Sequence, residues 1–115
     1  MESQLEWFNK DYVPYREMLK EAMGDVAKLH TDFSAKVYQD GSLSTKVKRL
    51  MAMCVALSVG CPGCMIGQTK AAIENGATKQ DVIEAFQVVL AVRGTTAYGW
   101  SNKITKLLEE MGIWQ

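Results

Sequence analysis

The chain has 115 residues, its 13 lysines and arginines balance 13 aspartates and glutamates, and 48% of its residues are apolar. This length suits one compact domain, 1–115, and is too short for a catalytic domain joined to a separate substrate domain. Because neither charge sign forms a run, the sequence offers no basic stripe for nucleic acid or for an anionic membrane surface. It also lacks a signal peptide and a membrane-spanning apolar stretch, so we expect a cytoplasmic protein without nucleic-acid or membrane partners.

Apolar residues recur at spacings of three and four along almost the whole chain, which predicts an all-α, single-domain bundle of about six helices. Pro14 and Gly24 bound a first predicted helix at residues 14–23, preceded by a further helix or an arm. A second helix is predicted from an apolar stripe that ends at Asp40-Gly41. The stripe consists of Val26, Leu29, Phe33 and Val37.

The third predicted helix begins after Ser44, a favourable N-cap residue, and ends at Gly60. Its expected buried face consists of Val47, Leu50, Met51, Cys54 and Leu57. Pro62, which suits a first helical position, then opens a fourth helix that ends at residues 75–76. Thr78 and Asp81 have the spacing of a capping box and begin a fifth predicted helix, which carries Val82, Ile83, Phe86, Val89 and Leu90. A final helix is predicted over about 96–112.

The segment Cys61-Pro62-Gly63-Cys64 lies at the start of that fourth helix, with Cys61 at or beside its N-cap. Unpaired amides and the positive end of the helix dipole stabilise a thiolate there, and two intervening residues let both sulfurs meet. The sequence therefore favours a redox-active pair that forms a reversible intramolecular disulfide.

Two other interpretations of the pair remain open. The cysteines could be buried apolar thiols, or they could be half of a structural zinc site. A zinc site needs further ligands, and the chain offers only Cys54 and the single histidine, His30. We therefore expect no metal and no bound cofactor. Cys54 is expected to be an inert buried thiol, His30 a surface or packing residue, and Glu84 a half-buried carboxylate that needs a partner.

Several stretches together resemble a known family. They are residues 43–50 (Leu-Ser-Thr-Lys-Val-Lys-Arg-Leu), Gly60-Cys61-Pro62-Gly63-Cys64, Ala71-Ala72, Gly76-Ala77-Thr78 and residues 82–85 (Val-Ile-Glu-Ala). Over about residues 42–110 they are similar to the signature region of the alkyl hydroperoxidase D-like, carboxymuconolactone decarboxylase superfamily. The resemblance implies an all-α fold and assembly into a homo-oligomer, a hexamer or a trimer.

The resemblance also implies roles for the two cysteines. In members with the pair, the second cysteine, here Cys64, becomes the sulfenic acid, and the first, here Cys61, resolves it. A dithiol protein such as a lipoylated protein or thioredoxin then reduces the bridge. The N-cap position instead favours Cys61 as the thiol with the lower pKa. We assign the roles by the resemblance, because accessibility can outweigh the local field.

The chain departs from the family's peroxidases at three positions. The resemblance implies a glutamate twelve residues before the first cysteine and a histidine four after the second, yet these positions hold Arg49 and Gln68. Trp100 stands nearest to a further histidine of some relatives. Gln68 can form hydrogen bonds but cannot take a proton. Arg49 either holds a thiolate by its charge, or is a solvated residue on the outer face of its helix or a partner to an acid of a neighbouring subunit.

Three functions remain in play. The first is a thiol-disulfide oxidoreductase or weak peroxidase that acts on a small hydroperoxide or disulfide. The second is a lyase of the carboxymuconolactone decarboxylase branch that acts on a small lactone acid, with Arg49 or Arg93 as carboxylate anchor. The third is a non-enzymatic oligomeric binding protein. The cysteine pair favours the first.

Overall fold

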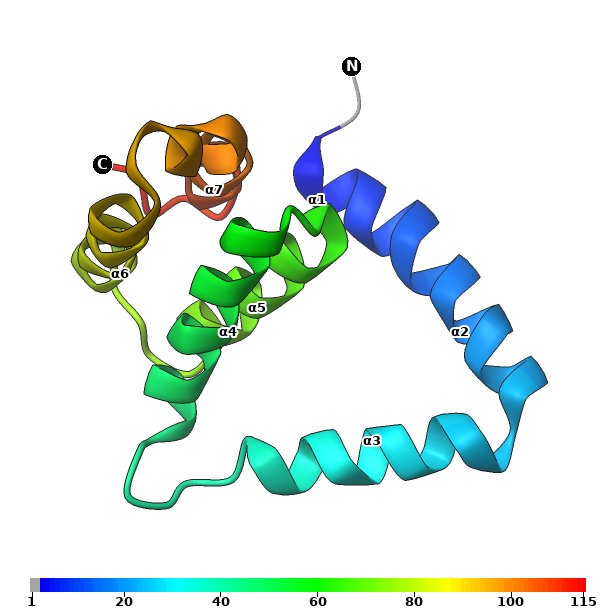
Figure 1. The fold of residues 1–115 in the computed structure, drawn as a ribbon. Helices are drawn as coiled ribbons and strands as arrows, with labels where there is room; N and C mark the ends of the chain where they lie inside the picture. Colours follow the sequence, from blue (N-terminus) through cyan, green and yellow to red (C-terminus); the bar gives the residue numbers. More distant parts are fainter. Residues whose placement is uncertain (1–2) are drawn as a thin grey trace.

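The computed structural model describes residues 3–115, which form helices joined by short turns (Figure 1). Helix α1 (Gln4–Trp7), a π-helical turn η1 (Phe8–Tyr12) and α2 (Val13–Met23) run on as one continuous rod. The further helices are α3 (Asp25–Val37), α4 (Thr45–Val59), α5 (Pro62–Glu74), α6 (Lys79–Arg93), the 3-10 turn η2 (Gly94–Trp100) and α7 (Ser101–Glu110). With the rod counted once, residues 3–115 form six α-helices and no strand, so the predicted all-α class is confirmed.

Most predicted helix ends lie where the sequence put them. The Ser44 hydroxyl accepts the Val47 N–H at 3.1 Å and starts α4, and Gly60 ends that helix in the left-handed conformation, with φ 77°. Thr78 and Asp81 each accept the other's backbone N–H, which is the predicted capping box of α6. These ends were predictable because each depends on residues within one turn of chain.

The last helix starts later than predicted. Residues 94–100 form a 3-10 turn, so α7 begins at Ser101 and not near residue 96. The Thr96 hydroxyl donates to the Arg93 carbonyl at 2.9 Å, and the Ser101 hydroxyl donates to the Tyr98 carbonyl at 2.9 Å. Such short-range bonds compete with regular α-helical pairing and accompany the tighter turn.

The core is built between α4, α5, α6 and α7. α4 and α5 pack along their lengths, and α6 and α7 close the other side (Figure 1). The fully buried large side chains of this cluster include Met53, Met65, Val82 and Leu108. A second cluster of Phe8, Ile66 and Leu107 attaches the base of the rod to α5 and α7. The Glu110 carboxylate also accepts the N–H groups of Gln4 and Leu5, at 3.0 and 2.9 Å.

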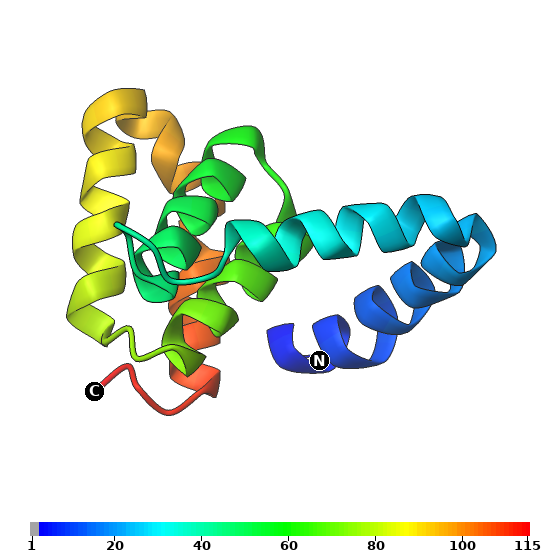
Figure 2. The ribbon, with the colours of Figure 1, turned by 90° about the horizontal axis from the view of Figure 1, so that it is seen from below.

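Helices α2 and α3 form an arm, residues 13–37, that projects away from this core (Figure 2). The predicted amphipathic helix over residues 26–37 exists, but its apolar stripe is not buried in this chain. Leu29 and Phe33 are 71% and 65% exposed. Val47 and Met51, also expected to be buried, are exposed on α4 because that helix turns the face with Met53 and Leu57 to the core. None of the helices in residues 3–115 is both long and apolar enough to cross a bilayer.

Candidate redox site

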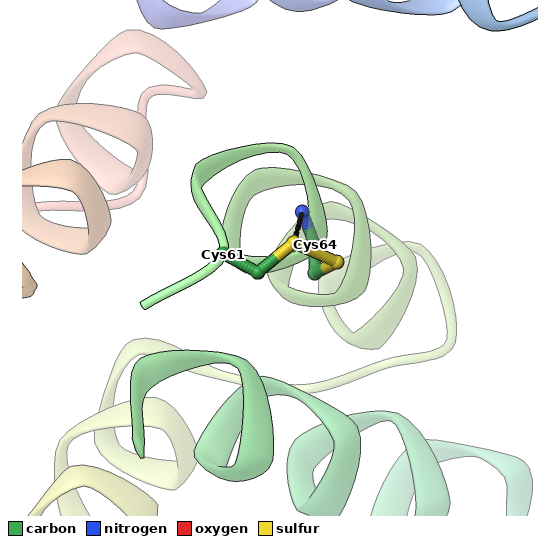
Figure 3. The surroundings of a disulfide bond; sticks show 2 residues. All are labelled: Cys61 and Cys64. Carbon is green, nitrogen blue, oxygen red and sulfur yellow. Dashed lines mark hydrogen bonds between the residues drawn. A yellow bond between two sulfur atoms is a disulfide. The ribbon is translucent and has the colours of Figure 1, made fainter. Parts of the chain in front are cut away.

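Cys61 and Cys64 lie at the N-terminus of α5 and are joined by a disulfide (Figure 3). Their Cα atoms are 5.2 Å apart, and both side chains are partly exposed. Cys61 is the N-cap residue with an extended backbone, and Pro62 is the first residue of the helix, as predicted. The Cys64 N–H donates to the Cys61 Sγ at 3.3 Å. A sulfur that accepts a backbone N–H at a helix start is placed to carry negative charge.

The end of α4 holds this turn in place. The N–H groups of Gly60 and Cys61 both donate to the carbonyl of Ala56, at 2.9 and 3.1 Å. With its positive φ, Gly60 reverses the chain within one residue, and Pro62 then restarts a helix. The residues 60–64, which we call the cysteine turn, are therefore fixed by hydrogen bonds at one end and by a helix start at the other.

Aromatic rings from the rod cover the first turns of α5. A Cβ atom built at Gly63, between the two cysteines, would overlap the ring of Tyr12. A Cβ atom at Gly67 would lie 3.2 Å from the ring of Phe8. The π-helical turn presents both rings to α5, and the two glycines lie four residues apart on one helix face. Tyr12 was not among the residues predicted from the sequence, although this spacing of glycines is a signal of close approach by another element.

Trp100 also lies at the cysteine turn, although it is far away in sequence. Its indole Nε1 is 3.1 Å from the position of a Cβ atom at Gly60. Its side chain remains 38% exposed. Since an indole cannot exchange its proton near neutral pH, Trp100 shapes the turn sterically.

Arg49 and Gln68, the two positions at which the chain departs from the resemblance, are in direct contact. Arg49 Nη1 donates to Gln68 Oε1 at 2.9 Å, and the guanidinium lies over the ring of Tyr38 at 3.6 Å from its centroid. Gln68 follows Cys64 by one helical turn on α5. Arg49 is half-buried and its Nε is fully buried, so the interpretation as a solvated outer-face residue is wrong.

The other candidate residues lie apart from the pair. Cys54 is a half-buried free thiol whose Sγ donates to the Ala85 carbonyl at 3.4 Å, and burial raises its pKa. Glu84 was expected to be half-buried but is exposed, and it accepts a hydrogen bond from Gln80. Arg93 is exposed at the end of α6. Residues 3–115 contain no group of three or more His, Cys, Asp or Glu side chains placed to hold a metal ion.

Two solved structures share this fold over most of their length. A carboxymuconolactone decarboxylase family protein of Legionella pneumophila superposes with a TM-score of 0.83 over 90% of this chain and 92% of its own, at 21% identity. A family protein of Thermotoga maritima, for which a role in the antioxidative response has been suggested, gives a TM-score of 0.76 at 24% identity. That match covers 88% of this chain and 89% of the other.

Sequence comparison identifies relatives and the family. The uncharacterized protein 4 in the cox locus of Paracoccus denitrificans is 37% identical over 78 residues, 68% of this chain and 70% of its own. An uncharacterized protein of Cupriavidus necator is 31% identical over 65 residues, 56% of this chain and 58% of that relative. The carboxymuconolactone decarboxylase family profile matches residues 24–106, which is most of the chain. The chain therefore belongs to the carboxymuconolactone decarboxylase family.

Proposed function

We propose that this protein is a thiol-disulfide oxidoreductase whose working groups are Cys61 and Cys64. One observation carries the proposal: the two sulfurs are bonded to each other at a helix N-terminus, where the backbone also donates to the Cys61 sulfur. A thiolate at such a position is stabilised by the helix dipole, and a partly exposed pair is accessible to small molecules.

With a hydroperoxide as substrate, the reaction has two steps. The Cys64 thiolate attacks the terminal peroxide oxygen, the O–O bond breaks, and the alkoxide takes a proton to leave as an alcohol, while the cysteine becomes a sulfenic acid. The Cys61 thiolate then attacks the Cys64 sulfur, hydroxide leaves and is protonated to water, and the disulfide forms. The role of each cysteine follows the resemblance to the family's peroxidases. A cytoplasmic dithiol protein would reduce the bridge and complete the cycle.

We expect peroxidase activity to be weak. Neither Arg49 nor Gln68 can accept a proton at neutral pH, so neither can act as the general base that the resemblance implies at these positions. The Arg49 charge, held by Gln68 one turn after Cys64, can instead favour a thiolate electrostatically. The suggested antioxidative role of the Thermotoga maritima protein supports a redox function for the pair.

The test determines which cysteines form a disulfide and which remain free thiols after mild oxidation. The reduced protein is exposed to mild hydroperoxide, free thiols are blocked, and the products are identified by mass spectrometry. We expect a Cys61–Cys64 bridge with Cys54 blocked as a free thiol, and a stable sulfenic acid at Cys64 in the Cys61→Ser variant. A dominant bridge to Cys54, or no bridge, would contradict the proposal. Either outcome would favour the alternative functions, a lyase or a binding protein.

A further inference from the structure

A hollow of about 600 Å³ lies between the arm and α4 and is lined by residues of the rod, α3 and α4. Its polar lining includes Arg16, Lys20, His30 and Arg49. Its apolar lining comes from Met23, Val26 and Ala27. None of the described residues that line the hollow is acidic. The volume is that of a small-molecule pocket, and the lining is both cationic and apolar.

The charge of Arg49 is not matched by any acid among the described side chains. Its Nη1 binds the neutral Gln68, its face rests on Tyr38, and its buried Nε has no hydrogen-bond partner. A buried donor on a charged group costs free energy until an acceptor reaches it. A carboxylate matches a guanidinium in charge and in geometry, because its two oxygens can accept two parallel N–H groups.

Further positive charge comes from α2. Arg16 and Lys20 both pair with Glu17, at 3.0 and 3.6 Å, so this group of three keeps one net positive charge. Glu17 itself does not line the hollow. The hollow therefore combines a cationic group on α2 with the unmatched cation on α4.

The hollow adjoins the cysteine turn through two of its lining residues. The ring of Tyr12 covers Gly63, between the two cysteines. Arg49 binds Gln68, one helical turn beyond Cys64. A molecule whose anionic end is held at Arg49 would therefore lie beside the helix that carries the pair.

We propose that the hollow is the substrate-binding site and that it selects a small disulfide or hydroperoxide carrying a carboxylate beside an apolar body, with Arg49 as the anchor. The assignment of a disulfide or hydroperoxide as the reacting group rests on the proposed redox function, whereas the recognition of the carboxylate does not.

The first experiment measures recognition alone. Nitrobenzoate and its neutral analogue nitrobenzamide are titrated into the protein, and the NMR signal of the Arg49 Nε–H group is followed. We expect the carboxylate to bind about tenfold more tightly than the amide. Calorimetry should show that Arg49→Gln removes this preference and that Arg49→Lys keeps part of it. Lys106→Gln, which removes an exposed charge on α7, should not change it. Equal binding of both probes, or a preference that Arg49→Gln leaves unchanged, would overturn the proposal.

The second experiment measures reaction. A thiolate of the reduced pair attacks the disulfide of dithiobis(nitrobenzoate) and releases one aryl thiolate; the other cysteine then displaces the second, and the pair is oxidised to its disulfide. Rates are compared with those of the neutral dithiodipyridine and normalised to a free small thiol. We expect a preference of about tenfold for the carboxylate reagent, lost in Arg49→Gln and weakened by salt. Carboxylate binding in a protein whose pair reacts with neither reagent would support the binding site and contradict the redox function. A pair that reacts with both reagents without any preference for the carboxylate would support the redox function and contradict the binding site.

Discussion

At the scale of single residues, the contact between Arg49 and Gln68 is the chain's main departure from the peroxidases that it resembles. Their side chains meet at 2.9 Å beside the helix that carries the pair. The positions expected to hold a proton relay are therefore adjacent, but neither residue can exchange a proton. What they retain is a hydrogen bond and a fixed positive charge.

Restoring a proton acceptor should raise peroxidase activity. We expect Gln68→His combined with Arg49→Glu to speed hydroperoxide reduction by about a hundredfold over the parent, because general base catalysis contributes that much where geometry permits. Gln68→His alone should give less. If Arg49 holds the thiolate by its charge, Arg49→Glu alone should slow alkylation at neutral pH. Alkylation rates against pH for the four proteins provide the measurement, and four identical profiles would show that neither position influences the pair.

The close approach of Tyr12 to Gly63 gives a second prediction. Gly63→Ala should lower the free energy of unfolding by about 1–3 kcal/mol, because its methyl group would overlap the Tyr12 ring. Gly99→Ala is the matched control, since a Cβ atom there meets nothing within 4 Å. Adding Tyr12→Ala should make Gly63→Ala much less costly than it is in the parent. Urea unfolding of the four variants tests this, and equal losses for the two glycine changes would contradict the steric explanation.

At the scale of helices, the capping box of α6 makes stability depend on pH. The backbone N–H of Thr78 is the main cause that holds the pKa of the Asp81 carboxyl below its ordinary value, and the charge of Lys46 adds to it. Because the pKa is lowered in the folded state, the stabilisation is complete above the unfolded pKa of about 4 and is lost as the pH falls through the folded value.

We therefore expect Asp81→Asn to destabilise the protein at pH 7 and to lose this effect as the pH falls below about 4. Thr78→Ala removes the other half of the box, which is not ionisable, and should cost about 1 kcal/mol with little pH dependence. Thermal unfolding of the parent and both variants across this range is the measurement. An Asp81→Asn deficit that is as large in acid as at neutral pH would mean that the carboxylate charge is not what stabilises the helix start.

How much could be predicted differs between local and long-range features. The caps at Ser44 and Thr78, the stop at Gly60 and the helix start at Cys61 were predictable, because each depends on neighbours within a few residues. The glycine spacing signals a close approach at Gly63, but the identity of its partner, Tyr12, was not predictable, since the contact joins segments some fifty residues apart by packing alone. Periodicity predicts that a helix has an apolar face, but it does not identify what covers that face.

At the scale of the whole molecule, the arm carries apolar side chains that a single chain does not bury. The exposed apolar side chains of α2 and α3 that do not line the hollow are Tyr15, Met18, Leu19, Leu29, Phe33 and Val37. Contiguous apolar surface of this kind is typical of contacts between subunits. The predicted homo-oligomer, a hexamer or a trimer, would bury it.

We expect light scattering to show an oligomer for the parent and a smaller species for Leu29→Glu combined with Phe33→Glu, because two carboxylates would then face an apolar interface. Ala35→Glu is the control: it adds a carboxylate at an exposed position on the opposite face of α3 from this stripe. It should leave the mass unchanged. A parent that is monomeric at micromolar concentration would contradict the assembly.

The rod from Gln4 to Met23 connects the cysteine helix to the arm, because its first residues pack on α5 and its last residues belong to the arm. Its base is held by the hydrogen bonds from Gln4 and Leu5 to Glu110 and by the packing of Phe8 against Ile66 and Leu107. We therefore expect a neighbouring subunit that contacts the arm to change how closely the Tyr12 ring packs against Gly63, between the two cysteines. Assembly would then affect the accessibility of the two thiols. We expect the reduced pair to be alkylated faster in the dissociated Leu29→Glu, Phe33→Glu protein than in the Ala35→Glu control.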